Sequence, residues 1–361
     1  MEPSKQRLRK KEEMELKKFR LLVVASFLVV FVLGCVVSAA PKLLIGLSMD
    51  TLKEERWQKD RDIFIANAKK LGCEVNVQAA NSDDALQVSQ CENLLSQGVQ
   101  VLVIIPHNAE AVASVVDSAA KSKVKTLAYD RLIKNCDLDL YISFDNEKVG
   151  QLQAEAITKL VPKGTYAYIG GSPTDNNAFM FKAGAMKVLE PLVKKGDIKL
   201  AYDQFTNDWK PEVAQTNMEN CLTKLNNKID AVVAANDGTA GGVIQALTDQ
   251  KLAGKVPVSG QDGDLAACQR IVEGTQTMTV YKPIKIIASE AAKAAVALAK
   301  GQKVKTNKVI DNGKNKNTPF LALTPVAVTK TNMYNVIIKD GFQKLEEVYR
   351  NVPKDKWPAQ K

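Results

Sequence analysis

Histidine is nearly absent, with His107 the single example in 361 residues, and the sequence offers no Ser-His or Cys-His pair. Hydrolases with a serine or cysteine nucleophile need a base of this kind beside it. Glycine is also sparse where nucleotide-binding loops require it. Gly46, in the first predicted strand, has no second glycine near it. The pair Gly170-Gly171 is too short to form such a loop. These absences argue against nucleophilic hydrolysis and dinucleotide chemistry.

Cysteine is scarce as well, and no two cysteines have the Cys-x-x-Cys spacing. Apart from Cys35, an odd number remains, which predicts neither a disulfide framework nor a zinc site. We therefore expect buried free thiols and no metal or other cofactor. The cysteines concerned are Cys73, Cys91, Cys136, Cys221 and Cys268.

Positive charge is not concentrated in any one block, although the formal net charge is +10. The first twenty residues carry eight Lys or Arg and four Glu, and the remaining lysines are scattered without interleaved aromatic residues. This pattern favours a solvated surface near an anionic membrane over a groove for nucleic acid.

Residues 21–41 contain no charged side chain. A basic region followed by an apolar segment is typical of an export signal. About twenty apolar residues are also enough for a permanent membrane anchor. The tetrapeptide VLGC, which ends at Cys35, resembles the lipobox of bacterial lipoproteins, in which the cysteine is lipidated. We favour lipidation of Cys35 over an uncleaved anchor, with cleavage near Ala39-Ala40 third. Each alternative places the body of the protein outside the cytoplasmic membrane.

From residue 42 onward, apolar strand-like segments alternate with amphipathic helical segments. This alternation predicts an α/β fold of two similar doubly wound parallel-sheet domains. Strands are expected at 43–49, 73–78, 101–105, 124–129, 140–144, 165–169, 198–205, 230–235, 256–259, 277–281 and 322–329. Helices are expected at 57–71, 84–97, 111–121, from 146 to about 160, and at about 176–190, 211–225, 238–252, 264–273 and 284–300. Residues 347–361 are expected to form a disordered tail.

Polar side chains follow the carboxyl ends of the predicted strands, where open α/β sheets bind ligands. Carboxylates, amides and guanidinium groups hold neighbouring hydroxyls in a bidentate manner, and indole faces stack on the C–H face of a sugar ring. The set therefore favours a neutral polyol over a phosphate. Its members are Asp50, Arg56, Trp57, His107, Asp130, Arg131, Asp175, Asn176, Asn177, Trp209, Asn236, Asp237, Asp262 and Lys282.

Two other interpretations of these residues remain open. Asp130-Arg131 alone is equally typical of a solvated turn. Asp237 and Asp262 form a conceivable carboxylate pair for glycosidase chemistry, although cations and indoles around them fit binding as well.

Eight segments, in order along the chain, resemble the D-xylose-binding proteins of bacterial ABC sugar importers, which belong to the type I periplasmic binding proteins. The resemblance runs from about Leu43 to Leu345 and excludes the first forty residues and the tail. The segments are DTLKEERWQKDRDIF, VLVIIP, LAYDRLI, YISFDNEKVGQLQAEA, GGSPTDNNA, NNKIDAVVAANDGTAGG, SGQDGDLA and GTQTMTVYKPI.

The resemblance implies two lobes joined by a three-strand hinge, with one monosaccharide, D-xylose, enclosed between them. It implies a monomer that is not an enzyme and that delivers the sugar to an ABC transporter permease. Trp57 and Trp209 would sandwich the sugar ring, and Asp130 would orient Arg131. The residues that would hydrogen-bond the sugar are Arg56, Arg131, Asn177, Asn236, Asp262 and Lys282.

The expected lobes are discontinuous in sequence. The first comprises residues 42–145 and about 282–322, and the second comprises residues 146–281 and about 323–346. Sugar-responsive repressors share this fold, but a DNA-binding regulator needs a helix-turn-helix where this chain has its export segment. A membrane-anchored sugar sensor that presents the closed form to a signalling partner remains an alternative. His107 lies outside the family pattern, and a rim position and a purely structural role are both open.

Overall fold

The computed structural model describes residues 3–33 and 42–359, with side chains from residue 7 to 22 and from 42 onward. The chain divides into two compact units, residues 1–42 and 43–361. The described part of the first unit contains the helix α1 (Pro3–Leu33). Within the described part of the chain, no helix combines the length and the apolar character needed to cross a membrane. Cys35 lies outside the described residues.

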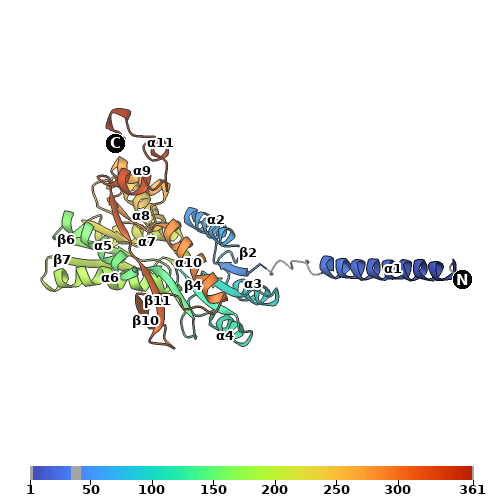
Figure 1. The fold of residues 1–361 in the computed structure, drawn as a ribbon. Coiled ribbons are helices and arrows are strands. Elements are labelled where there is room, and N and C mark those ends of the chain that lie inside the picture. Colours follow the sequence, from blue (N-terminus) through green and yellow to red (C-terminus); the bar gives the residue numbers. More distant parts are fainter. Residues whose placement is uncertain (1–2, 34–41, 360–361) are drawn as a thin grey trace. The chain divides into compact units, whose positions relative to one another are not determined.

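The second unit begins with a lobe built on a seven-stranded sheet of order β10-β11-β5-β4-β3-β1-β2 (Figure 1). All neighbouring strands are parallel except β10 and β11. The central strands are buried on both faces, which explains their nearly continuous apolar sequences. The strands are β1 (Leu44–Met49), β2 (Glu74–Ala79), β3 (Val101–Ile104), β4 (Lys125–Tyr129), β5 (Leu140–Phe144), β10 (Lys308–Ile310) and β11 (Thr318–Leu323).

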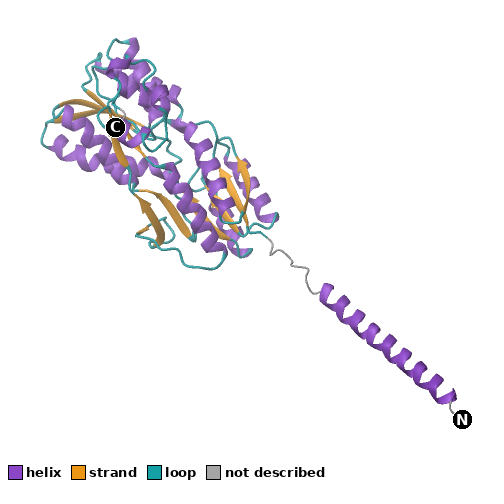
Figure 2. Ribbon diagram, turned by 45° about the horizontal axis from the view of Figure 1, so that its top comes forward, coloured by secondary structure: helices purple, strands orange, loops and turns teal. Residues whose placement is uncertain are grey.

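Helices cover both faces of this sheet. Figure 2 shows the strands in orange among the purple helices. One face packs against α2 (Glu55–Lys70) and α10 (Ile284–Ala299), whose alanines allow close approach to the strands. The other face packs against α3 (Asp84–Ser96) and α4 (Ala113–Lys121). The two apolar layers fix the ends of the strands, and therefore the loops that follow them.

The second lobe contains a parallel sheet of order β7-β6-β8 and an antiparallel pair of β9 with β12. Helices α5 and α6 cover one face of the parallel sheet, and α7 and α8 cover the other. The strands are β6 (Gly164–Ile169), β7 (Ile198–Gln204), β8 (Ala231–Ala234), β9 (Met278–Tyr281) and β12 (Val326–Thr329). The helices are α5 (Asn146–Leu160), α6 (Asn176–Lys194), α7 (Pro211–Leu225), α8 (Asp237–Asp249), α9 (Leu265–Glu273) and α11 (Leu345–Val348).

The chain passes between the lobes three times. β5 leads into α5, β9 leads into α10, and β11 leads into β12. The predicted α/β class with two parallel-sheet lobes and three crossings is therefore confirmed. The residue limits given above for each lobe stay a prediction.

Three sequence expectations differ from the structure. Residues 256–259 form only an isolated bridge, Val232 to Val258, and not a ladder. The strand expected at 322–329 is two strands, because Pro325 lies between β11 and β12 and the chain changes sheets there. β10 was not predicted, since its three residues are too few to show a pattern.

The predicted disordered tail is wrong for residues 347–359. Val348 and Tyr349 are buried, and the ring of Trp357 lies 6.0 Å from that of Tyr349. Nε1 of Trp357 donates to the carbonyl oxygen of Val352 at 2.8 Å. Two prolines and the lack of periodicity concealed this packing, because it depends on single aromatic contacts and not on a regular helix.

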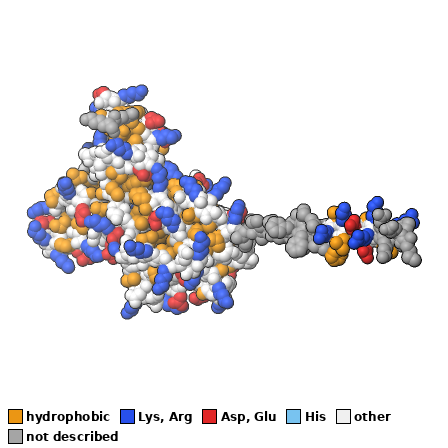
Figure 3. All heavy atoms as spheres, in the orientation of Figure 1, with side chains coloured by type: hydrophobic (Ala, Val, Ile, Leu, Met, Phe, Trp, Pro, Cys, Tyr) orange, Lys and Arg blue, Asp and Glu red, His pale blue; other side chains and the backbone are white. Residues whose placement is uncertain are grey.

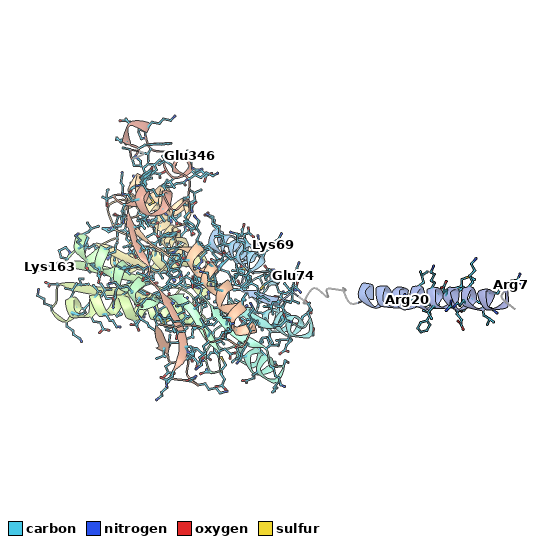
Figure 4. The ribbon with its side chains drawn as sticks, in the orientation of Figure 1. Arg7, Arg20, Lys69, Glu74, Lys163 and Glu346 are labelled. Atoms are coloured by element: carbon cyan, nitrogen blue, oxygen red, sulfur yellow. The ribbon has the colours of Figure 1, made fainter. Side chains whose placement is uncertain are left out.

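Charged side chains are dispersed over the body of the molecule. On the face drawn in Figure 3, lysine and arginine lie among acidic and neutral side chains. Lys69 of α2, Lys163 in the loop before β6 and Glu346 of α11 extend outward (Figure 4). The five described cysteines are buried free thiols, as predicted.

Candidate functional site

The nine sequence-predicted ligand residues line one cavity. Both lobes contribute, and most of the side chains are less than a tenth exposed. The nine residues are Arg56, Trp57, Asp130, Arg131, Asn177, Trp209, Asn236, Asp262 and Lys282.

Asp130 fixes the end of β4 and also links the two lobes. Its φ of +61° turns the chain sharply out of the strand, a conformation that Asp and Asn tolerate better than most residues. Its carbonyl oxygen accepts hydrogen bonds from the hydroxyls of Tyr141 (3.0 Å) and Ser143 (2.6 Å) and from Nδ2 of Asn177 (3.0 Å). Because Asn177 lies in the first turn of α6 in the second lobe, the last bond crosses the cleft.

The guanidinium group of Arg56 lies at the centre of a buried cluster of charges. It contacts three carboxylates: Asp60 at 3.2 Å, Asp130 at 3.0 Å and Asp262 at 3.1 Å. The ammonium group of Lys282 lies 3.4 Å from Asp130 and 3.6 Å from Asp262. The two cations therefore share two carboxylates across the cleft.

Burial alone raises the pKa of Asp130, but Arg56, Lys282 and Arg131 outweigh it and lower the pKa to about 2. At Asp60, burial prevails over the nearby Arg56 and raises the pKa to about 6. Asp130 is thus held ionised, whereas Asp60 is pushed toward its neutral form.

The direct contacts of Arg131 go to a second set of acceptors and not to the Asp130 carboxylate. Its Nη1 donates to Asp50 at 2.6 Å and to the carbonyl oxygen of Pro106 at 3.2 Å, and its Nε lies 2.9 Å from Asp175. The expectation that Asp130 orients Arg131 is therefore wrong. Adjacent side chains at a sharp turn point to different partners, and here the carboxylate partners are Asp50, which follows β1, and Asp175, which caps the start of α6.

The two indoles line the cavity in different surroundings. The Trp57 ring is covered by the guanidinium groups of Arg56 and Arg131, 4.2 and 5.2 Å from its centre. The Trp209 ring meets Phe181 edge-on at 6.3 Å, and its Nε1 is buried without a hydrogen-bond partner in the described structure. A ring held this way keeps its N–H available to a ligand.

Asp175, which belongs to the predicted strand-end set, also lines the cavity. The sequence analysis missed three further lining residues, Glu54, Phe181 and Gln261. Oε2 of Glu54 and Oε1 of Gln261 are buried, and neither has a hydrogen-bond partner among the described atoms. Burial raises the pKa of Glu54, against the effect of Arg131. Such orphaned oxygens at a cavity wall are acceptors suited to ligand hydroxyls.

Two of these residues carried a sequence signal. Gln261 is adjacent to Asp262 in the same strand-end loop, and Phe181 lies four residues after Asn177 on the same helix face. Glu54 carried none, because Glu54 and Glu55 look alike in the sequence. In the structure, Glu55 accepts a hydrogen bond from the side-chain amide of Gln343 and forms an ion pair with Lys59, whereas Glu54 faces the cavity.

Asp237 and His107, both at strand ends, do not line the cavity. The carboxylate of Asp237 accepts hydrogen bonds from the backbone N–H groups of Gly263 and Asp264 and from the side chains of Thr279 and Gln276. It therefore shapes the loop that carries Asp262. The proposed glycosidase pair of Asp237 and Asp262 does not form, because Asp237 faces this loop.

The cavity combines charged donors, paired carboxylates, orphaned acceptors and two indole faces. A ligand with several hydroxyl groups would satisfy both donors and acceptors, and its C–H faces would contact the aromatic rings. Among the residues described, no group of His, Cys, Asp and Glu is arranged to hold a metal ion.

Comparison with known proteins gives a consistent result. The model of the periplasmic binding protein domain matches residues 45–303. A D-xylose-binding periplasmic protein of Haemophilus influenzae is 55% identical over 307 residues, which cover 85% of this chain and 92% of the relative. The D-xylose-binding periplasmic protein of Escherichia coli is 52% identical over 335 residues, covering 93% and 100%.

A solved structure shows the same fold. An ABC transporter solute-binding protein of Clostridium phytofermentans with bound β-D-glucose has a TM-score of 0.79 and 34% identity to this chain. The match covers 84% of this chain and 99% of that one.

Proposed function

The chain belongs to the family of periplasmic binding proteins, and from this premise we propose that it captures D-xylose between its two lobes and delivers it to an ABC transporter permease. The observation that carries the proposal is the single cavity lined by all nine predicted residues. Two relatives that are more than half identical over most of the chain are named for the same sugar. Such a protein acts outside the cytoplasm.

Within the cavity, we assign hydrogen bonding of the sugar to the polar residues named above and stacking on the ring to Trp57 and Trp209. The orphaned Glu54 and Gln261 oxygens would accept from two further hydroxyls. Ligand contacts from both lobes favour the closed form, because only that form makes all of them. A permease can then recognise closure as the sign that sugar is bound.

We expect D-xylose to bind more tightly than D-glucose. The hydroxymethyl group of glucose needs space in a cavity walled by Trp57, Phe181 and Trp209, and steric exclusion discriminates strongly. D-glucose is the second candidate, because the similar solved structure contains it. Calorimetric titration of the full chain with D-xylose, D-glucose and D-ribose decides between them, and equal affinity for xylose and glucose would contradict the proposal.

The same titration tests the site. Asp262→Asn preserves the shape of the side chain and tolerates the φ of +107° at this position, but removes a charge shared by Arg56 and Lys282. We expect xylose affinity to fall roughly 10- to 100-fold, as for loss of a buried charge-assisted contact. Asp355→Asn, at an exposed position, serves as the matched control. Full affinity in Asp262→Asn would remove this residue from the site.

We further propose that Cys35 is lipidated and attaches the mature chain to the membrane. The support is the VLGC ending of the uncharged segment. Metabolic labelling with a palmitate analogue should mark the wild type and not Cys35→Ser. An unlabelled wild type would instead favour an uncleaved anchor or ordinary signal cleavage.

A further inference from the structure

His107, which the proposed function does not use, lies between two carboxylates from different lobes. Its ring Nδ1 is 2.7 Å from Oδ1 of Asp84, the first residue of α3 in the first lobe. Its Nε2 is 3.5 Å from Oδ1 of Asp208, which follows β7 in the second lobe. The side chain is only 12% exposed. The ring therefore spans the line along which the two lobes meet.

The two distances identify where the ring proton lies. Both carboxylate oxygens are acceptors, and the short contact requires the proton of a neutral ring to be on Nδ1. Nε2 then presents a lone pair to Asp208, which accounts for the longer separation and for its lack of a hydrogen-bond partner in the described structure. A second proton on Nε2 converts this contact into a charge-assisted hydrogen bond.

Bonds that do not depend on pH hold the surrounding loops together. The backbone N–H of Ala109 donates to the carbonyl oxygen of Thr174 at 3.0 Å, and Oγ1 of Thr174 donates to the carbonyl oxygen of His107 at 3.4 Å. The backbone N–H of Asp208 donates to Oγ of Ser172 at 3.2 Å. The ring is thus already positioned against Asp208 when the lobes are closed.

Asp208 is connected directly to the sugar site. Asp208 and Trp209 are consecutive residues with φ of +53° and +57°, a costly backbone conformation that its surroundings must hold in place. Trp209 lines the cavity. A bond from His107 to Asp208 therefore stabilises the turn that presents this indole to the ligand.

The other charged groups near the ring are already paired. Lys210 contacts the second oxygen of Asp208 at 2.9 Å and is the main reason that the pKa of Asp208 is lowered. Nδ2 of Asn108 donates to the second oxygen of Asp84 at 3.0 Å. These contacts keep both carboxylates oriented toward the ring.

Three further groups lie on the adjoining segments. Asp83 accepts from the backbone N–H of Leu86, and Glu110 pairs with Lys134 at 3.3 Å. None of these contacts competes for Nε2 of the ring.

We propose that His107 is a proton-dependent latch, in which the doubly protonated ring bridges Asp84 and Asp208 and favours the closed lobes. The inference rests on the proposed function. The open form lacks the contact with Asp208, so the closed form binds the additional proton more tightly. Sugar binding then takes up protons, and sugar affinity decreases as pH rises through the range in which histidine side chains titrate.

The test is calorimetric titration of the full chain with D-xylose from pH 5.5 to 8. We expect wild-type affinity to be about three- to tenfold higher at the acidic end, since the bridge is partly exposed to solvent. His107→Gln retains a donor for Asp84 but cannot gain a charge, and Asp208→Asn removes the second acceptor charge. Both variants should show a weaker dependence of affinity on pH than the wild type, with near wild-type affinity at pH 8.

Two buried carboxylates also titrate in this interval, with the pKa of Asp60 raised by burial to about 6 and that of Asp237 to about 7. Both are present in every variant, so their contribution persists in His107→Gln. A wild-type profile that is flat, or that remains unchanged in His107→Gln, overturns the latch.

Proton uptake gives a second readout. Titrations in buffers of different ionisation enthalpy should show a fraction of a proton taken up per sugar by the wild type near pH 6.5, and less by His107→Gln. If the wild type binds no D-xylose at any pH, the proposed function fails, and scattering of the sugar-free chain decides the latch. A smaller radius of gyration at pH 5.5 than at pH 8, lost in His107→Gln, supports the latch, and equal radii overturn it.

Discussion

Single residues in this cleft have two tasks, because side chains that face the ligand also hold the lobes together. Asp130 is the clearest example. Its carbonyl oxygen joins β5 and α6, while its carboxylate neutralises Arg56 and Lys282. A substitution that preserves the backbone and removes only the charge separates the two tasks.

Asp130→Asn is such a substitution, since Asn tolerates the φ of +61° and leaves the carbonyl contacts intact. The folded state lowers the pKa of this carboxyl from 3.8 to about 2. The charge therefore stabilises the fold above pH 4, and this contribution is lost as pH falls toward 2. We expect the variant to lose about 2 kcal/mol of unfolding free energy at pH 7.

Chemical denaturation of sugar-free protein at pH 7 and pH 3 measures the effect. The difference between wild type and Asp130→Asn should be smaller at pH 3. A difference of equal size at both values would show that the charge is not the cause.

The predicted residues line one cavity because strand ends of parallel sheets converge at one edge. The sequence did not show how they pair. Arg131 selects Asp50 and Asp175, which lie far from it in sequence, over its neighbour Asp130. Such choices depend on side-chain directions at turns, which a strand-and-helix pattern does not contain.

At the scale of elements, periodicity predicted the long helices and buried strands, and the failures occurred where periodicity is absent. The tail is held by the contact of Tyr349 with Trp357, and β10 has only three residues. The crossing near Pro325 divides one apolar segment between two sheets. In each case tertiary contacts, and not local preference, determine the structure.

One helix pair depends on glycine at a close crossing. A Cβ at Gly184 of α6 would lie 1.9 Å from the carbonyl oxygen of Glu147 in α5, and one at Gly150 of α5 would lie 1.8 Å from that of Phe181. Backbone atoms cannot move aside as side chains do. The two glycines therefore allow α5 and α6 to touch, and α6 carries Asn177 at its start.

Gly184→Ala should force the two helices apart and lower the unfolding free energy by about 1–3 kcal/mol, as overpacking does. Gly241→Ala in α8 is the matched control, because its Cβ would have no neighbour closer than 3.5 Å. The control should be neutral or stabilising by up to about 1 kcal/mol, given the helix propensity of Ala. Thermal unfolding compares the two, and equal stability of both variants would contradict the close-crossing argument.

For the whole molecule, the cleft contacts describe a closed form. Hydrogen bonds and ion pairs join Asn177 to Asp130 and Asp262 to Arg56 across the cleft. Sugar should shift the population toward this form. Small-angle scattering of wild type should show a smaller radius of gyration at saturating D-xylose than without sugar. An unchanged radius despite calorimetric binding would argue against closure of the lobes.

The position of β11 beside β5 determines when the first lobe can be completed during synthesis. Phe320 lies next to Tyr141 in the sheet, with the two rings stacked at 4.5 Å. The ribosome synthesises residues in sequence, so β5 keeps an unpaired edge while the whole of α5 to α10 is being added. The first lobe thus cannot be finished during synthesis until nearly the entire chain has emerged. A nascent chain in this state remains incompletely folded, and accessible to chaperones, almost to its last residues.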